Sequence, residues 1–134
     1  MVFADSRGID THGVSNALRG YVRNYLSGTC NSRPKNSIIK STPSTAVVDG
    51  DNGLGLMTAP FGMNIAIEKA KNFGIGSVTA MNGRHFGAAA YHAAMALKHD
   101  MIGISMTTGG MNVVPVDGAK PMVGLNPIGI AVPT

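Results

Sequence analysis

Apolar side chains recur with helical spacing between positions 14 and 26. They lie three or four residues apart and would share one face of a helix: Val14, Ala17, Leu18, Tyr21, Val22, Tyr25 and Leu26. Thr11 is a residue type that commonly caps a helix N-terminus. Gly28 suits the position after the last turn, where left-handed backbone is favourable. The pattern predicts an amphipathic helix that opens at Thr11 and ends before Gly28.

The helical period stops after position 28. Residues 29–43 are rich in Asn, Ser, Thr, Pro and Lys, which predicts a linker with at most a short strand near residues 38–39. We expect this linker to divide the chain into part of a small helical domain, residues 1–36, and part of a larger domain, residues 37–134.

Beyond the linker, short apolar runs alternate with segments of helical period. Strands are expected at residues 46–48, 75–81, 101–106 and 128–132. A turn-rich run, residues 49–53, follows the first of them. This alternation predicts an α/β or α+β fold.

Helices are expected between these strands. One should begin near Thr58, with Pro60 in its first turn, and end at Gly74. Its buried face would carry five apolar residues at helical spacing: Met63, Ala66, Ile67, Ala70 and Phe73. A loop over residues 82–87 should lead into an alanine-rich helix that continues to about Lys98. The order of the strands stays open, because one sequence does not specify it.

Composition narrows the class of protein. Of the 134 residues, 44% are hydrophobic and 13% are charged, which is typical of a globular chain. The 18 glycines lack the three-residue period of collagen, so they indicate tight turns and close backbone approaches. Cys30 is the only cysteine, which excludes a disulfide scaffold and fits a cytoplasmic protein. We expect no membrane segment, because no stretch reaches the roughly 20 apolar residues that a span needs.

The net charge of +4 is concentrated in the first 40 residues. Six Lys and Arg stand there against two Asp, whereas the charges of the other residues cancel. Two interpretations remain open: attraction of an anion such as a dinucleotide or a carboxylate, or an ordinary solvated helix face. Nucleic acid is not an expected partner, since no block of Lys and Arg is interleaved with aromatic residues.

Two of the four histidines have a setting suited to proton transfer. His12 and His85 are each expected at a helix N-terminus, with a glycine within the next two positions. The positive end of a helix lowers the pKa of an imidazole, and a neutral imidazole can take a proton from an alcohol and return it to a carbonyl. A structural role is the alternative for each of them. His92 and His99 lack such a setting, and we expect no catalytic role for them.

Other kinds of site find less support in the sequence. Gly53-Leu54-Gly55 precedes a helix and Gly74-Ile75-Gly76 precedes a strand, so neither has the strand, GxGxxG, helix order of a Rossmann phosphate loop. His85 and His92 have no carboxylate at ligand spacing, so no metal site is expected. A Gly-x-Ser-x-Gly elbow for a serine nucleophile is also missing.

Five motifs, in a fixed order, give the chain a family resemblance. The run from Ala4 to Val14, ADSRGIDTHGV, resembles the AD-x-RG-(I/V)-D-(S/T)-HG signature of the malate/L-lactate dehydrogenase family of NAD(P)-dependent oxidoreductases. Four further segments resemble motifs of that family: DGDNGLG at 49–55, AIEKA at 66–70, HFGAAAY at 85–91 and GLNP at 124–127. The resemblance covers essentially the whole chain.

The resemblance implies hydride transfer between NAD or NADP and a 2-hydroxy or 2-oxo acid such as malate or lactate, carried out by a homodimer. It also implies a non-Rossmann fold, in which a small helical segment is followed by a mixed, mostly antiparallel sheet with flanking helices. The family's histidines for proton transfer and substrate contact fall on His12 and His85. These are the two histidines selected above from their local setting.

Two departures from the family pattern concern substrate and cofactor contacts. Many members carry an arginine four residues after the first motif histidine, suited to gripping a carboxylate, but this chain has Asn16 there. Arg19, one helical turn farther on, either takes over the carboxylate or lies on a solvated face. The family's Thr-Asn-Ser or Thr-Asn-Thr cofactor segment is Thr107-Thr108-Gly109 here. Asn126 of the Asn-Pro motif is the remaining expected cofactor contact.

Family members extend beyond both ends of this stretch, with a helical segment before the signature and a long cofactor-binding portion after the Asn-Pro motif. We therefore expect a fragment that is inactive by itself. The alternative to a dehydrogenase is a fragment that keeps only subunit association or anion binding.

Overall fold

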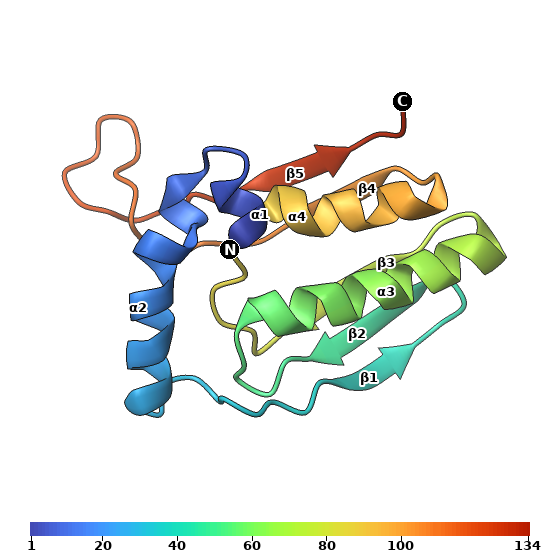
Figure 1. The fold of residues 1–134 in the computed structure, drawn as a ribbon, viewed down its shortest axis with the longest axis horizontal. Helices are drawn as coiled ribbons and strands as arrows, with labels where there is room; N and C mark the ends of the chain where they lie inside the picture. Colours follow the sequence, from blue (N-terminus) through green and yellow to red (C-terminus); the bar gives the residue numbers. More distant parts are fainter.

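A computed structural model describes all of residues 1–134 as an N-terminal helical part followed by two small sheets with helices beside them (Figure 1). The helical part has three elements: α1 Val2–Asp5, the 3₁₀ helix η1 Asp10–His12 and α2 Val14–Leu26. The remainder contains five strands and the helices between them: β1 Ser37–Ser41, β2 Thr45–Asp49, α3 Gly55–Phe73, β3 Ser77–Met81, α4 Ala89–Ala94, the 3₁₀ helix η2 Met95–His99, β4 Gly103–Met106 and β5 Ile128–Ala131.

The strands form two separate sheets. The first has the order β1-β2-β3, with β1 antiparallel and β3 parallel to the central β2. The second is an antiparallel pair of β4 and β5. The expected mixed, mostly antiparallel α/β architecture with flanking helices is confirmed, although its strands are split between two sheets.

Helix α3 lies across one face of the first sheet (Figure 1). At Gly62 an added Cβ would come within 3.3 Å of the Val78 side chain, so the missing side chain lets helix and sheet approach closely. Val48 and Ile67 are buried in this layer. The packing fixes the N-terminal end of α3, next to which the candidate site lies.

Three helix boundaries differ from the expected ones. α2 begins at Val14, after Gly13, and Thr11 does not cap it. The Asp5 carboxylate instead accepts the Val14 N–H at 3.0 Å. α3 begins at Gly55, so Pro60 lies in its second turn. The expected alanine-rich helix breaks after Ala94 into the tighter turns of η2.

The two glycines expected to end helices do so, whereas two strand starts and one buried position differ from the expected ones. Gly28 follows α2 with φ of 70°, and Gly74 ends α3 with φ of 79°. Strands β3 and β4 begin two residues later than expected, at Ser77 and Gly103. Phe73, expected on the buried face of α3, is 57% exposed, because the last turn of the helix extends past the ends of the strands (Figure 1).

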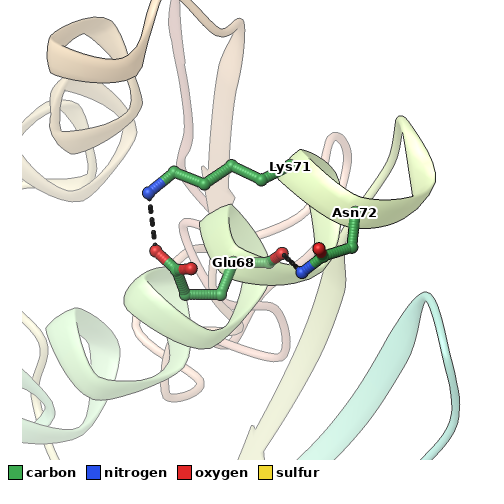
Figure 2. Close-up of polar contacts among 3 residues, drawn as sticks. All are labelled: Glu68, Lys71 and Asn72. Carbon is green, nitrogen blue, oxygen red and sulfur yellow. Dashed lines mark hydrogen bonds and ion pairs between the residues drawn. The ribbon is translucent and has the colours of Figure 1, made fainter.

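Three polar residues near the C-terminal end of α3 contact one another (Figure 2). Lys71 Nζ lies 2.7 Å from Glu68 Oε1, and Asn72 Nδ2 donates to the Glu68 carbonyl oxygen at 2.8 Å. The hydrogen bond and charge of Lys71 hold the pKa of Glu68 below its ordinary value. Because both charged side chains are exposed, the pair contributes little to stability.

The helical part and the remainder share a buried cluster. Tyr21 of α2, Cys30 of the linker and Leu54 before α3 are each less than one-tenth exposed and pack together. The division into two domains near residue 36 stays a prediction. No helix in residues 1–134 combines the length and the apolar content needed to cross a membrane.

Candidate active site

His12 and His85 lie side by side in the folded chain. Their ring centroids are 5.4 Å apart and the ring planes differ by 21°. His12 ends η1, whereas His85 lies in the loop between β3 and α4. The fold therefore brings together, from two distant segments, the histidines that the sequence singled out.

A hydroxyl group orients each of these rings through Nδ1. The Tyr21 hydroxyl oxygen lies 2.7 Å from His85 Nδ1, and the Thr11 hydroxyl oxygen lies 2.9 Å from His12 Nδ1. A hydroxyl can donate or accept, so it accommodates both the neutral ring and the cation. Nε2 of each ring makes no hydrogen bond with the chain and is left to contact a ligand.

The protonation of His85 is biased by its surroundings. Partial burial lowers the pKa of its imidazole, and the neighbouring His12 ring lowers it further. The pKa of His85 is lowered, as the sequence predicts. A helix N-terminus is not the cause, because α4 begins only at Ala89. Burial raises the pKa of Tyr21, which keeps its hydroxyl protonated near pH 7.

Hydrogen bonds hold the loop that carries His85 at three consecutive carbonyl groups. The Gly55 N–H donates to the carbonyl oxygens of Arg84 and His85 at 3.2 and 3.1 Å. His92 Nε2 donates to the Phe86 carbonyl oxygen at 2.7 Å. A Cβ at Gly55 would collide with Phe86 and Arg84, so glycine is needed for this close approach. Because the loop occupies the start of α3, that helix end is not an open phosphate site.

The structure does not bring Asn16 or Arg19 into contact with the histidine pair. Asn16 Nδ2 donates to the Asp10 carbonyl oxygen at 2.8 Å and so stabilises the η1 turn. Arg19 is exposed on α2. It lies two positions from Tyr21, which is about 200° around a helix, and therefore on the face turned away from His85.

The expected cofactor contacts gather at the end of β4. Asn126 Oδ1 accepts the Gly109 N–H at 3.0 Å, which joins this end to the segment before β5. The Thr107 hydroxyl donates to the Thr108 carbonyl oxygen at 3.4 Å. Thr108 and Gly109 are exposed. The Asn126 amide oxygen is thus used within the chain, whereas the Thr108 hydroxyl is open to solvent.

Two hollows differ in their relation to the histidines. A recess of about 190 Å³ is lined by His12 and His92 and mainly by apolar side chains, among them Phe3, Leu56 and Tyr91. A larger hollow of about 480 Å³ lies between α3 and the β1–β2 connection and contains neither histidine.

In residues 1–134, no three His, Cys, Asp or Glu side chains gather as a metal ion would require.

Sequence reasoning missed Tyr21 and His92 as parts of this site. The apolar spacing places Tyr21 on the buried face of α2, and a buried tyrosine needs a partner for its hydroxyl. His92 has no glycine neighbour, yet it is 1% exposed. The sequence signal for His92 is a polar ring among alanines in a helix, because a buried polar group needs a hydrogen-bond partner.

Comparisons with known proteins agree across the whole chain. A family model described as malate/L-lactate dehydrogenase matches residues 1–134. The chain is 46% identical over 134 residues to malate dehydrogenase of Pyrococcus horikoshii, an alignment that covers 100% of this chain and 37% of that protein. It is 41% identical over 130 residues to L-sulfolactate dehydrogenase of Methanocaldococcus jannaschii, covering 97% of this chain and 38% of that one.

A solved structure of a malate dehydrogenase also matches the whole fold of this chain. The structure of malate dehydrogenase from Pyrococcus horikoshii OT3 superposes on this chain with a TM-score of 0.95 at 47% identity, covering 99% of this chain and 38% of that chain. The chain therefore spans about 37% of the length of the curated malate dehydrogenase that it matches.

Proposed function

The chain belongs to the malate/L-lactate dehydrogenase family, and on that premise we propose that it supplies the proton-transfer site of an oxidoreductase. The enzyme would move a hydride between NAD or NADP and a 2-hydroxy or 2-oxo acid such as malate or lactate. The observation that carries the proposal is the pair His12 and His85, with rings 5.4 Å apart and both Nε2 atoms free.

The pair meets the proton requirement of this reaction. Oxidation of a 2-hydroxy acid removes a hydride from carbon and a proton from the hydroxyl oxygen, and reduction returns both. We assign the proton to His85 Nε2, because burial and His12 favour its neutral, proton-accepting form. His85 Nδ1–H can donate to the Tyr21 oxygen before and after Nε2 takes the proton. His12 would orient the substrate oxygen.

The chain's own residues fit one part of a nicotinamide cofactor. When bound, that cofactor supplies or accepts the hydride. The open Thr108 hydroxyl suits a contact to an amide or a ribose, and the exposed Gly109 lies beside it with its N–H already held by Asn126. They form no phosphate cradle, so the proposal assigns only this partial contact to Thr107, Thr108, Gly109 and Asn126. Arg19 and Asn16 stay proposed carboxylate contacts on the family resemblance alone, since Asn16 donates to the Asp10 carbonyl and Arg19 lies on the face of α2 turned away from His85.

Two further parts of the proposal concern the whole enzyme. We place it in the cytoplasm, which suits the single unpaired thiol of Cys30. We propose a homodimer, because the second sheet leaves large apolar side chains exposed on β4 and β5.

A graft tests the proposal. This chain would replace the matching segment of Pyrococcus horikoshii malate dehydrogenase, and absorbance at 340 nm would follow NADH or NADPH oxidation with a panel of 2-oxo acids. We expect activity from this grafted enzyme and none from the 134-residue chain assayed as its control. A correctly folded graft that is inactive with every 2-oxo acid would contradict the proposal and favour the alternative of association or anion binding alone.

A further inference from the structure

His92 is a polar side chain in an almost fully buried position. It is 1% exposed, in the middle of α4, and is one of the largest side chains that the fold encloses completely. Its ring packs against the ring of Phe86 with centroids 4.9 Å apart. A phenyl ring could fill this space, so the reason for an imidazole must lie in its polar atoms.

Only one of those polar atoms has a partner. Nε2 lies 2.7 Å from the Phe86 carbonyl oxygen, which can only accept, so Nε2 carries a proton. Nδ1 is buried without any hydrogen-bond partner. Burial lowers the pKa of the His92 imidazole and outweighs the opposing effect of the Phe86 carbonyl. The ring is therefore neutral and held in the tautomer with its proton on Nε2.

The carbonyl that His92 holds belongs to the residue next to His85. The Gly55 N–H, at the start of α3, donates to the carbonyls of the two preceding residues, Arg84 and His85. His92 is therefore the only side chain that donates a hydrogen bond to one of these three carbonyls. Without it, the peptide between Phe86 and Gly87 loses its hydrogen bond, and only Gly55 still holds the loop beside His85. The groups that face His85 itself are His12 from η1 and Tyr21 from α2.

We propose that His92 is a positioning residue, whose Nε2–H holds the Phe86 carbonyl and thereby keeps the His85 ring between Tyr21 and His12. Its ring is 1% exposed at the wall of the recess beside His12, so it acts through the Phe86 carbonyl rather than by contact with substrate. Its importance for catalysis rests on the proposed function, but the positioning itself is a property of the 134-residue chain and is measured there.

The test compares two substitutions by nuclear magnetic resonance titration of the histidines in the 134-residue chain. His92→Gln keeps an N–H donor at a similar reach, whereas His92→Phe keeps the ring and removes the donor. In His92→Phe we expect the pKa of His85 to rise toward the ordinary imidazole value of about 6.5, because the loop opens to solvent. His92→Gln should restore the lowered pKa, and the exposed His99 should titrate alike in all three proteins.

Two results would overturn the proposal. One is an unchanged pKa of His85 in a folded His92→Phe chain. The other, which needs no variant, is a ¹⁵N spectrum of the unsubstituted chain at pH 7 that shows His92 protonated on Nδ1. Neither readout involves enzyme activity, so an inactive grafted enzyme would refute the proposed function and leave this inference standing.

Discussion

Tyr21 and His12 act on His85 in different ways. Tyr21 fixes the ring through Nδ1 at 2.7 Å, while the stacked His12 ring makes a second positive charge beside it unfavourable. Two imidazoles at this distance cannot both be protonated without repulsion. The neighbouring ring therefore favours the neutral form of His85, the form that the proposed proton transfer needs.

Replacing His12 should change the protonation of its neighbour. In His12→Gln we expect the pKa of His85 to rise, because the repulsion between the two rings is removed while Tyr21 still holds Nδ1. A nuclear magnetic resonance titration of His85 measures this change. His99→Gln is the matched control, since His99 is an exposed residue at the end of η2. A pKa of His85 that stays constant or falls in His12→Gln would show that the rings are not coupled.

The two catalytic candidates could be predicted from the sequence, whereas their partners could not. His12 and His85 stand in family-like motifs beside glycines, and those signals are local. The apolar spacing around Tyr21 predicts a buried ring but not which group its hydroxyl meets, because that group lies 64 residues away. His92 contacts a carbonyl only six residues away, but the turn that brings it there depends on Gly55 of another helix.

At the level of elements, glycine has opposite effects at two helix positions. Gly74 ends α3 with φ of 79°, a conformation in which a Cβ is strained. Gly20 lies inside α2, and a Cβ added there would meet nothing within 4 Å. Glycine is thus required for the end of α3 and only weakens the interior of α2.

The same chemical change should therefore have opposite results at the two sites. Gly74→Ala should lower the free energy of unfolding by about 1–2 kcal/mol, the cost of left-handed backbone for a residue with a Cβ. Gly20→Ala should raise it by about 0.5–1 kcal/mol. Urea denaturation of both variants checks the pair. Equal effects in the two variants would mean that backbone conformation does not control these positions.

Elements were easier to predict than their ends. The strands and long helices follow from apolar periodicity, which is a local property of the sequence. The start of α2 depends on the Asp5 carboxylate, nine residues before the N–H that it accepts. The break between α4 and η2 follows from packing, because Gly103 brings β4 into contact with the Ala93 backbone. Such tertiary contacts leave no periodic signal.

The stability of the whole molecule should depend on pH through two histidines. The pKa values of both His85 and His92 are lowered in the folded chain, mainly by burial. The unfolded chain therefore binds more protons, so stability is complete above the ordinary imidazole value of about 6.5 and is lost as pH falls below it. Thermal unfolding between pH 7.5 and 5 should show a falling Tm, with a weaker dependence in His92→Phe. A constant or rising Tm would contradict this account.

The second sheet leaves one of its faces uncovered. Its small residues, Gly103 and Gly129, approach the alanines of α4, whereas the large apolar side chains point the other way and are 52–64% exposed: Ile104, Met106, Ile128 and Ile130. Exposed apolar patches of this kind mark surfaces that bind other protein segments.

This face should drive association of the chain. We expect dimers or larger species in sedimentation velocity at micromolar concentration, and a smaller species when Ile130→Lys places a charge on the face. Ser15→Lys adds the same charge on the exposed surface of α2 and should leave association unchanged. A single monomeric boundary for the unsubstituted chain would count against the prediction.

We propose that His85 transfers the proton while His12 orients the substrate, and pH–rate profiles of the grafted enzyme distinguish these two roles. His85→Ala should lower kcat about 10² to 10⁴-fold and abolish the limb of the profile in the imidazole range, with cofactor affinity nearly unchanged. His12→Ala should chiefly raise the KM for the 2-oxo acid and keep that limb. Loss of the limb in His12→Ala together with its retention in His85→Ala would contradict the claim and reverse the two roles.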